Sequence, residues 1–251
     1  MNRYLSTDGL YARWNLYKIL TIILITALAA GFLVYRYPIG TVVLDENYVS
    51  AETGETTQLV ASYPKLEGVV SGSGAPVVCA AGFAAIVAVM SLTGCGYGAK
   101  TEYTIRRLRV KERQAVLLWA AYHTVLLVIY WAVLAAVLYG VMHLRLQMEV
   151  PVDYFVYMYG PQSMLLLCYT DTFLHHLLPL RDVAAWGVGI ASVLAAALST
   201  VLFSYRQRRG SFSVMVLLAL AGTIGSFFCG LGENANALLM VLLLGVAGAA
   251  F

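Results

Sequence analysis

The chain has 251 residues, of which 61% are hydrophobic and only 12% are charged, and its mean hydropathy is +0.78. A water-soluble domain carries about 25% charged residues, so these figures exclude a soluble globular protein and indicate an integral membrane protein. The net charge of +3 is small, so its distribution along the chain is more informative than its sum, and we expect no nucleic-acid partner.

The first 18 residues predict an amphipathic helix. Thr7 or Asp8 can begin it. Apolar and aromatic residues then recur on one helical face at Leu10, Tyr11, Trp14 and Tyr17. Because Tyr and Trp favour the headgroup level of a bilayer, we expect an interfacial helix over residues 1–18 on the cytoplasmic surface. The alternative is that these residues are the first turns of a longer span.

Six segments are long and apolar enough to cross a bilayer, which takes about 20 residues. They cover residues 19–37, 76–96, 115–142, 183–205, 213–231 and 235–251. We therefore expect an all-α polytopic membrane protein, built as one domain over residues 1–251 and folded as a six-span helical bundle.

Residues 144–181 leave two alternatives open, a seventh span or an outer segment that re-enters the membrane. Prolines interrupt its apolar stretches at positions 151, 161 and 179. Cytoplasmic loops collect Lys and Arg. With six spans and both termini in the cytoplasm, only four of the sixteen Lys and Arg residues lie outside, namely Arg36, Lys65, Arg145 and Arg181. Seven spans would place six outside, so the charges favour six spans and an outer segment packed on the bundle.

The segment over residues 38–75 is the only sizeable polar stretch between spans. It contains one lysine, Lys65, against five carboxylates at Asp45, Glu46, Glu52, Glu55 and Glu67. The sequence TVVLDENYVSAETGETTQLVASY predicts short strands around polar turns. The segment is too small to fold as an independent enzyme domain, so we expect an outer loop with short strands.

The sequence GCGYGAKTEYTIRRLRVKERQ, residues 94–114, resembles a phosphate-binding loop at first sight. That motif needs glycine directly before the lysine, and Ala99 stands there before Lys100. It also needs a preceding strand in an α/β domain, whereas this stretch follows an apolar span. We therefore expect the chain to bind no ATP and no other cofactor by itself.

The same stretch predicts a short amphipathic helix on the cytoplasmic side. Thr101 can cap it, and Glu102 in its first turn suits the helix dipole. Tyr103, Arg106 and Arg107 then fall on one side, while Ile105 and Leu108 provide an apolar contact. A loop that only fixes orientation or binds anionic lipid needs positive charge but no helical order. A capped helix bearing an aromatic residue is what a docking element needs.

Other candidate residues have two interpretations each. His123 lies inside the third span, where an ionisable side chain indicates either a transport path or a packing hydrogen bond. Asp171 and His175 have the spacing of half a metal site, with His176 adjacent. Without further ligands, a polar cap at the membrane surface is the better interpretation. The four cysteines form no C-x-x-C pair, so we expect neither a disulfide framework nor a zinc site.

Small residues recur every fourth position on two of the predicted spans. Ala132, Ala136 and Gly140 form one such stripe, and Gly245 with Ala249 forms another. Such stripes permit close helix packing, within the chain or against a second chain.

The order of these elements resembles the permease subunits of ABC transporters of the ABC-2, or type V exporter-like, class. It is most similar to the small permeases of bacterial peptide-export and lantibiotic-immunity systems. The resemblance covers most of the chain as topology. Its motifs are residues 100–113, and more weakly FLHHLLPLRD before the fourth span and RQRRG after it. One departure is that the long outer segment lies between spans three and four, where the family often has it between spans five and six.

The resemblance implies a cytoplasmic coupling loop over residues 97–114 that docks into a separate ABC ATPase. The docking residues it implies are Thr101, Glu102, Tyr103, Arg106, Arg107, Leu108 and Arg109. ATP and Mg²⁺ would be bound by that ATPase, and the other partners would be a second permease chain, the same or homologous, and membrane lipid. The expected location is the bacterial cell membrane, the inner or cytoplasmic one.

The expected function is the membrane-spanning permease subunit of an ATP-driven transporter, which exports an amphipathic peptide or a lipid-like compound. The chain is then not an enzyme by itself. Two alternatives stay open. One is a non-transporting anchor or assembly subunit of a complex, and the other is a membrane-embedded enzyme centred on Asp171, His175 and His176.

Overall fold

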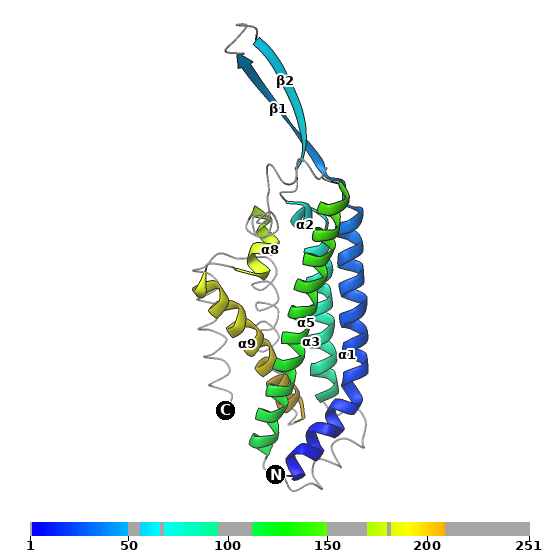
Figure 1. Ribbon diagram of the computed structural model, residues 1–251. Coiled ribbons are helices and arrows are strands. Elements are labelled where there is room, and N and C mark those ends of the chain that lie inside the picture. The colour runs from blue at the N-terminus through cyan, green and yellow to red at the C-terminus, as the bar shows by residue number, and fades with distance from the viewer. Residues whose placement is uncertain are drawn as a thin grey trace.

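The described part of the chain is a bundle of long helices with a two-stranded ribbon at one end (Figure 1). This computed structural model describes residues 2–49, 56–65, 68–94, 112–149, 170–179 and 182–208. Within them lie the helices α1 (Asn2–Arg36), α2 (Val69–Gly72), α3 (Ala75–Gly94), α5 (Glu112–Glu149), α8 (Thr172–Leu177) and α9 (Val183–Arg208), and the strands β1 (Gly40–Val49) and β2 (Thr56–Lys65).

Four helices are long and apolar enough to cross a membrane. The candidate spans are Asn15–Arg36, Ala75–Thr93, Val116–Met148 and Val183–Gln207. They coincide with the first four predicted spans and fit a multi-pass membrane protein. The third is longer than predicted, because α5 continues to Glu149, so residues 144–149 belong to this helix and not to the segment after it. The predicted spans over residues 213–231 and 235–251 lie outside the described residues.

The direction of α9 relative to α5 bears on how many times the chain crosses the membrane. Trp131 of α5 packs against Trp186 of α9, and His123 of α5 bonds to Thr200 of α9. Residue numbers therefore rise in opposite directions along the two helices, so α5 and α9 are antiparallel. The end of α5 and the start of α9 therefore point in the same direction, which favours an even number of crossings, or none, between them; most of the joining segment, residues 150–169 and 180–181, lies outside the described residues, so the number of spans stays a prediction. The C-terminal end of α9 lies at the same end as the N-terminus of α1 (Figure 1).

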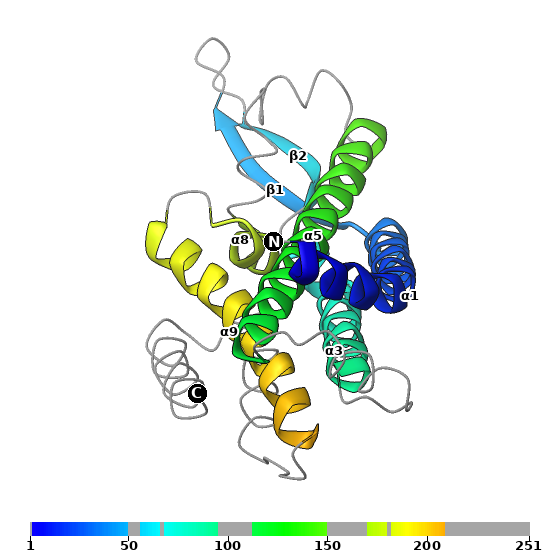
Figure 2. The ribbon, with the colours of Figure 1, turned by 90° about the horizontal axis from the view of Figure 1, so that it is seen from below.

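Helix α1 is one continuous helix of 35 residues. Figures 1 and 2 show that it bends, so that its first turns run across the lower end of α5 before the helix joins the bundle. The helix predicted for residues 1–18 and the first span are thus one element with a change of direction. That its first turns lie on the membrane surface stays a prediction.

The core lies where α1, α3 and α5 meet, and Gly82 of α3 permits the close approach. A Cβ atom at Gly82 would collide with Thr26 of α1 and lie 2.7 Å from the hydroxyl of Tyr130 in α5. That hydroxyl donates a hydrogen bond of 2.6 Å to the carbonyl of Cys79. Large side chains fill the core above and below this crossing, including Ile19, Phe83, Ile86, Met90, Leu127, Leu134, Leu138 and Met142.

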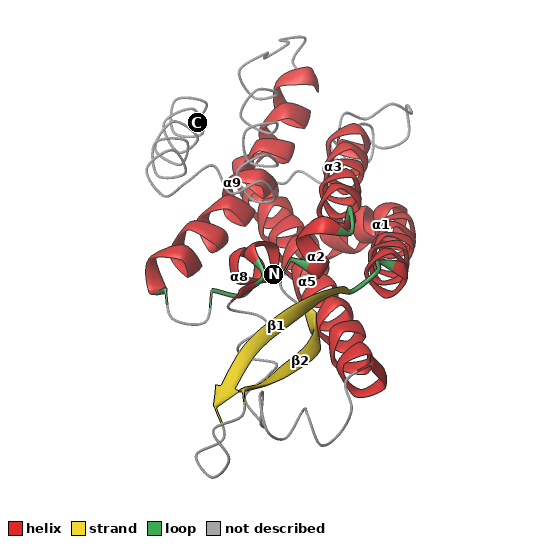
Figure 3. Ribbon diagram, turned by 90° about the horizontal axis from the view of Figure 1, so that it is seen from above, coloured by secondary structure: helices red, strands yellow, loops and turns green. Residues whose placement is uncertain are grey.

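The ribbon is an antiparallel hairpin whose register runs from Gly40 opposite Lys65 to Val49 opposite Thr56. Each strand has ten residues. Figures 1 and 3 show it running outward from the end of α1, beyond the end of the bundle. We call this end the hairpin end.

The opposite end carries the basic residues, and we call it the basic end. Helix termini gather there: the start of α1, the end of α3, the start of α5 and the end of α9 (Figure 1). The basic residues of these termini are Arg3, Arg13, Lys18, Arg113, Arg206 and Arg208. The sequence between α3 and α5, which lies outside the described residues, contains Lys100, Arg106, Arg107, Arg109 and Lys111. Among the described residues, Asp45 and Glu46 of β1, Glu149 and Asp171 lie towards the hairpin end, and Asp8 and Glu112 lie at the basic end, so charge is partly separated along the bundle axis.

Candidate functional site

The predicted docking residues, Thr101, Glu102, Tyr103, Arg106, Arg107, Leu108 and Arg109, all lie outside the described residues. The described helices fix only where this segment starts and finishes. It leaves α3 after Gly94 and enters α5 at Glu112, both at the basic end. The segment is therefore joined directly to both α3 and α5.

His123 is described, and it lies fully buried between α5 and α9. Its Nδ1 is 2.8 Å from the hydroxyl oxygen of Thr200. The Thr200 hydroxyl donates its one proton to the carbonyl of Ala197 at 2.7 Å, so it can only accept from the imidazole. This arrangement favours the tautomer in which His123 carries its proton on Nδ1 and donates to Thr200. The result is a buried hydrogen bond between two candidate spans.

A second polar contact joins α9 to α3 close to the first. The Ser204 hydroxyl lies 2.9 Å from the carbonyl of Ser91 and 2.9 Å from that of Thr200 in its own helix. Ser91 and Ser204 are both buried. Together with His123, these residues connect α3, α5 and α9 through hydrogen bonds at one level of the bundle.

Asn15 brings α1 to the same level. From the crossing of Thr26, Gly82 and Tyr130, helix geometry places Asn15 about 16 Å away along α1. The same geometry places Ser91 about 14 Å along α3 and His123 about 10 Å along α5. Counted by helix rise alone, the three residues lie at similar depths. Asn15 is fully buried, and neither its amide oxygen nor its amide nitrogen has a hydrogen-bond partner in the described part of the chain.

We call Asn15, Ser91, His123, Thr200 and Ser204 the polar layer. Hydrogen bonds between membrane helices contribute only about 0.6 kcal/mol on average, so these bonds orient the helices without locking them. The unpaired amide of Asn15 costs about 1–3 kcal/mol where it lies. A change in helix packing that gave it a partner would recover that energy.

Sequence reasoning identified His123 but not its partners. A signal for them exists, because Ser192, Thr200 and Ser204 stand at multiples of four residues and share one face of α9. All three are buried. A polar stripe on a predicted span indicates a face turned towards other helices, since lipid offers no hydrogen bonds. Asn15 could have been noted as an amide at the start of a span.

Asp171 forms a structural clamp at the hairpin end. It is fully buried. Its Oδ1 accepts from the N–H groups of Phe173 and Leu174 at 3.0 and 3.1 Å, which caps α8. Its Oδ2 accepts from the N–H groups of Val70 and Ser71 in α2 at 3.0 and 3.1 Å, and from the Ser71 hydroxyl at 3.4 Å. One carboxylate thus joins two segments about 100 residues apart.

The half metal site considered from the sequence has a simpler explanation. Both oxygens of Asp171 are occupied by backbone donors, so this carboxylate serves α2 and α8 and has no oxygen to spare for a metal. His175 and His176 lie in the last turn of α8 and are half-buried. Within the described ranges, no group of three or more His, Cys, Asp or Glu residues could hold a metal ion.

Two further contacts fix the hairpin end. Arg145 of α5 is buried, and its Nη1 donates to the carbonyls of Val34 and Tyr37 at 2.9 and 2.6 Å. It thereby satisfies carbonyls at the C-terminal end of α1 that the helix leaves unpaired. Trp131 Nε1 donates to the carbonyl of Leu177 at 2.9 Å, which ties α8 to α5. These bonds hold the hairpin end of the bundle together.

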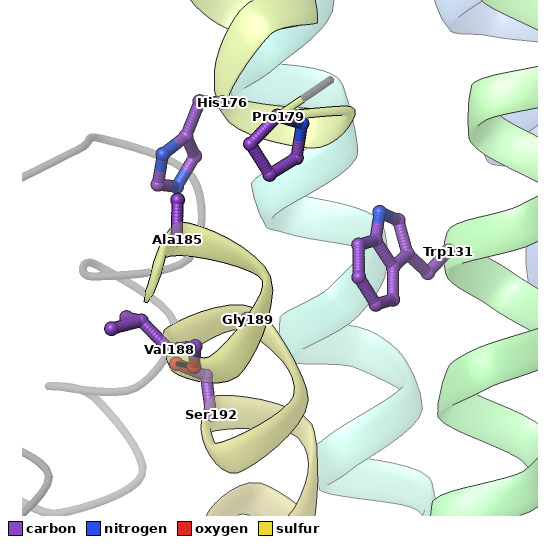
Figure 4. A pocket seen from close by; sticks show the side chains of 7 residues that line it. All are labelled: Trp131, His176, Pro179, Ala185, Val188, Gly189 and Ser192. Carbon is purple, nitrogen blue, oxygen red and sulfur yellow. Dashed lines mark hydrogen bonds between the residues drawn. The ribbon is translucent and has the colours of Figure 1, made fainter. Parts of the chain in front are cut away.

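Figure 4 shows a small hollow beside Trp131, between α5, α8 and α9. It is lined by Trp131, His176, Pro179, Ala185, Val188, Gly189 and Ser192. The Ser192 hydroxyl is already bonded to the Val188 carbonyl at 2.9 Å. The walls are mainly apolar, and His176 is the single ionisable lining residue. The hollow suits an apolar group better than a reacting polar substrate.

Comparison of the chain with protein-family models, with curated proteins and with solved structures finds no match.

Proposed function

We propose that the chain is the membrane-spanning permease subunit of an ATP-driven transporter of the ABC-2 class, and that it exports an amphipathic peptide or lipid-like compound. One observation supports this most. The cationic segment over residues 97–114 joins α3 to α5 at the basic end, where the termini of α1 and α9 also lie. A separate ATPase that docks on this segment would act on both helices at once.

Such a movement would change the hydrogen bonds of the polar layer. His123 lies 11 residues after Glu112, the first residue of α5, which is about 16 Å along the helix. Ser91 lies three residues before Gly94, the last residue of α3. A shift of α3 against α5 would strain the bonds that both make with α9. In this proposal His123 holds the resting contact with Thr200 and releases it during transport.

Orientation and partners complete the proposal. The basic end faces the cytoplasm, both termini are cytoplasmic, and the membrane is the bacterial cell membrane. A second permease chain packs on the exposed small residues of α5. Ala132 and Ala136 are exposed there, and a Cβ at Gly140 would meet no atom within 4 Å. ATP and Mg²⁺ are bound by the ATPase subunit alone.

The hydrogen bonds from backbone donors to the Asp171 carboxylate favour a structural role for this residue, and so weigh against the enzyme alternative centred on it. The anchor alternative differs from the permease in one consequence. An anchor would hold its partner without affecting ATP turnover, whereas a permease would couple the two.

The test is to purify the chain from its source membrane in mild detergent and identify the proteins that copurify. We expect an ABC ATPase, and no ATP binding by the isolated chain. Reconstituted with that ATPase, the permease should change the rate of ATP turnover. ATP binding by the chain alone, lost on Lys100→Ala, would contradict the proposal.

A further inference from the structure

One face of α1 indicates where the hydrocarbon of the bilayer begins and ends. Tyr17 and Tyr35 are both exposed, and each is followed by an exposed cation, Lys18 or Arg36. The two pairs are 18 residues apart, which is five helical turns, so they share a face and lie about 27 Å apart. The exposed apolar residues between them are large, namely Leu20, Leu24, Ile25, Leu28 and Phe32.

This face of α1 is typical of contact with lipid. Thr21 is an exposed polar residue on it, and its hydroxyl donates to the carbonyl of Tyr17 in the same helix at 2.8 Å, so it needs no outside partner. Tyrosine favours the headgroup level, and the hydrocarbon core is about 30 Å thick. Tyr17 and Tyr35 therefore mark the two boundaries of the hydrocarbon.

Trp131 of α5 lies between these boundaries. Helices α1 and α5 run in the same direction (Figure 1). A Cβ atom at Gly31 of α1 would lie 3.1 and 3.4 Å from the side chains of Val137 and Val141 in α5. Counted by helix rise from this contact, Trp131 lies about 9 Å inside the Tyr17 boundary and about 18 Å inside the other.

Helix α8 ends and helix α9 begins near the depth of Trp131. Its Nε1 donates to the carbonyl of Leu177, the last residue of α8, at 2.9 Å. Its ring centroid lies 5.4 Å from that of Trp186, in the first turn of α9. Figure 1 shows the facing ends of the two helices part-way down the bundle. A helix end inside the bilayer is tolerated only where protein covers it or water reaches it.

The first residues of α9 favour water over a protein cover. Val183 is 84% exposed, and Ala184 is exposed as well. Asp182 is partly exposed, and its Oδ1 accepts from the N–H groups of Ala184 and Ala185 at 2.8 and 3.2 Å. In the described part of the chain it bonds to no cation.

The Asp182 carboxylate also lies inside the bilayer. It stands four residues before Trp186 and is therefore at most about 6 Å nearer to the hairpin end. A carboxylate at such a depth needs a counter-ion or water, and lipid chains offer neither. Towards the basic end, the way is closed, because α9 is buried among the other helices at Val193, Ala196 and Ala197. Water therefore has to come from the hairpin end.

We propose that water enters the bundle from the hairpin end and reaches the facing ends of α8 and α9. We call this space the vestibule. The hollow beside Trp131 forms its inner end (Figure 4). An amphipathic solute suits it, with its polar part in water at Asp182 and its apolar part against the hollow. That the exported compound passes through the vestibule rests on the proposed permease function, whereas water access needs no ATPase.

The experiment measures the rate at which single cysteines react with a membrane-impermeant methanethiosulfonate. It uses the full-length chain without its four native cysteines, in nanodiscs and without ATPase. Ala184→Cys tests the vestibule. Ile25→Cys is the matched control, because it is exposed at a similar depth on the lipid face of α1, and Gln147→Cys is the reference in water, because it is exposed beyond the Tyr35 boundary.

The three rates should fall into two groups. A thiol reacts as its thiolate, which forms in water and not in lipid. We expect Ala184→Cys to react within about tenfold of Gln147→Cys, and Ile25→Cys at least about a hundredfold more slowly. In intact cells, Ala184→Cys and Gln147→Cys should be labelled from the same side. Val183→Cys, at the more exposed neighbouring position, replaces Ala184→Cys if that variant does not fold.

The charge of Asp182 provides a second measurement. A carboxylate beside the reacting thiol should favour a cationic reagent over an anionic one. Asp182→Asn removes the charge and keeps a residue that caps helices well. In the Ala184→Cys background this change should lower the preference for the cationic reagent by about threefold or more. In the Gln147→Cys background the preference should stay the same.

Four results would overturn the inference. They are an Ala184→Cys rate as low as that of Ile25→Cys, an equally fast Ile25→Cys, labelling of Ala184→Cys and Gln147→Cys from opposite sides, and a reagent preference that Asp182→Asn leaves unchanged. Water access without ATPase copurification would leave this inference standing and contradict the proposed function. ATPase copurification with an unreactive Ala184→Cys would do the reverse.

Discussion

The two ends of the bundle satisfy their buried polar groups in different ways. At the hairpin end, Asp171 and Arg145 bond to backbone groups at helix ends, at distances between 2.6 and 3.1 Å. At the basic end, His123 bonds to the side chain of Thr200 in another helix. Asn15 has no hydrogen-bond partner in the described part of the chain.

This difference separates a rigid end from an adjustable one. Charged hydrogen bonds to helix ends are strong and directional, and losing one leaves backbone groups buried and unpaired. Neutral bonds between membrane helices are weak and can be exchanged at little cost. If the bundle moves during transport, α3, α5 and α9 should shift at the basic end and pivot at the hairpin end.

The largest expected effect concerns the side of the membrane on which each end lies. In a variant without the four native cysteines, Asn47→Cys should react with an impermeant maleimide in intact cells, because the proposed orientation places the hairpin end outside. Gln207→Cys should react only after permeabilisation, because Lys and Arg concentrate in the cytoplasm. Labelling of Gln207→Cys in intact cells would reverse the orientation of the two ends.

The rigid end should be strongly destabilised when the Asp171 carboxylate is removed. Asp171→Ala leaves the N–H groups of α2 and α8 without an acceptor, and should lower the free energy of unfolding by about 3 kcal/mol or more. Asp182 offers a matched control, since it caps α9 alone through Ala184 and Ala185. Asp182→Ala should cost about 1 kcal/mol. Unfolding with SDS in mixed micelles measures both, and equal costs would show that the clamp adds nothing to the cap.

ATPase docking at the basic end should depend more on the aromatic side chain of Tyr103 than on a solvated charge at the edge of the interface. Tyr103→Ala should weaken ATPase binding by about 2 kcal/mol, and Lys111→Ala, as a solvated charge, by much less. Arg106→Glu should weaken it further by placing a carboxylate against an acidic partner. Pull-down and ATP turnover are the measurements. Wild-type behaviour of both Tyr103→Ala and Arg106→Glu would exclude this segment as the coupling element.

Removing the unpaired amide should stabilise the resting bundle. Asn15→Leu should raise the free energy of unfolding by about 1 kcal/mol, because a buried polar group without a partner is lost. Gln147→Leu removes an amide from an exposed position of α5 and should change little. If the amide serves a second packing state, Asn15→Leu should also slow transport. A loss of stability in this variant would show that Asn15 supports the resting fold.

The smallest expected effect concerns the hydrogen bond between His123 of α5 and Thr200 of α9. A double-mutant cycle of His123→Phe and Thr200→Val should give a coupling energy of about 0.6 kcal/mol. Thr124 is the control, because its hydroxyl donates to Ala120 in its own helix at 2.8 Å. Thr124→Val combined with His123→Phe should show no such coupling. A coupling energy of several kcal/mol would place His123 among the rigid contacts.

The sequence alone determined the first four spans and their order. A backbone in lipid must satisfy its hydrogen bonds internally, so each long apolar run has to be a helix wherever it packs. The strand-rich composition of residues 38–75 likewise indicated a pairing segment, although not its register. In the sequence, basic residues follow the second and the fourth predicted spans. Because neighbouring helices are antiparallel, the basic residues that the structure describes there lie at one end of the bundle. The docking residues between Thr101 and Arg109 stay a prediction.

Only the tertiary structure decided which polar residues meet. Asp171 finds its partners Val70 and Ser71 about 100 residues earlier in the chain, and His123 finds Thr200 77 residues later. Such contacts depend on the rotation and depth of each helix, which follow from packing at places such as Gly82 and not from local sequence. For the same reason a carboxylate and two imidazoles that suggested a metal site in sequence became a helix clamp in the fold.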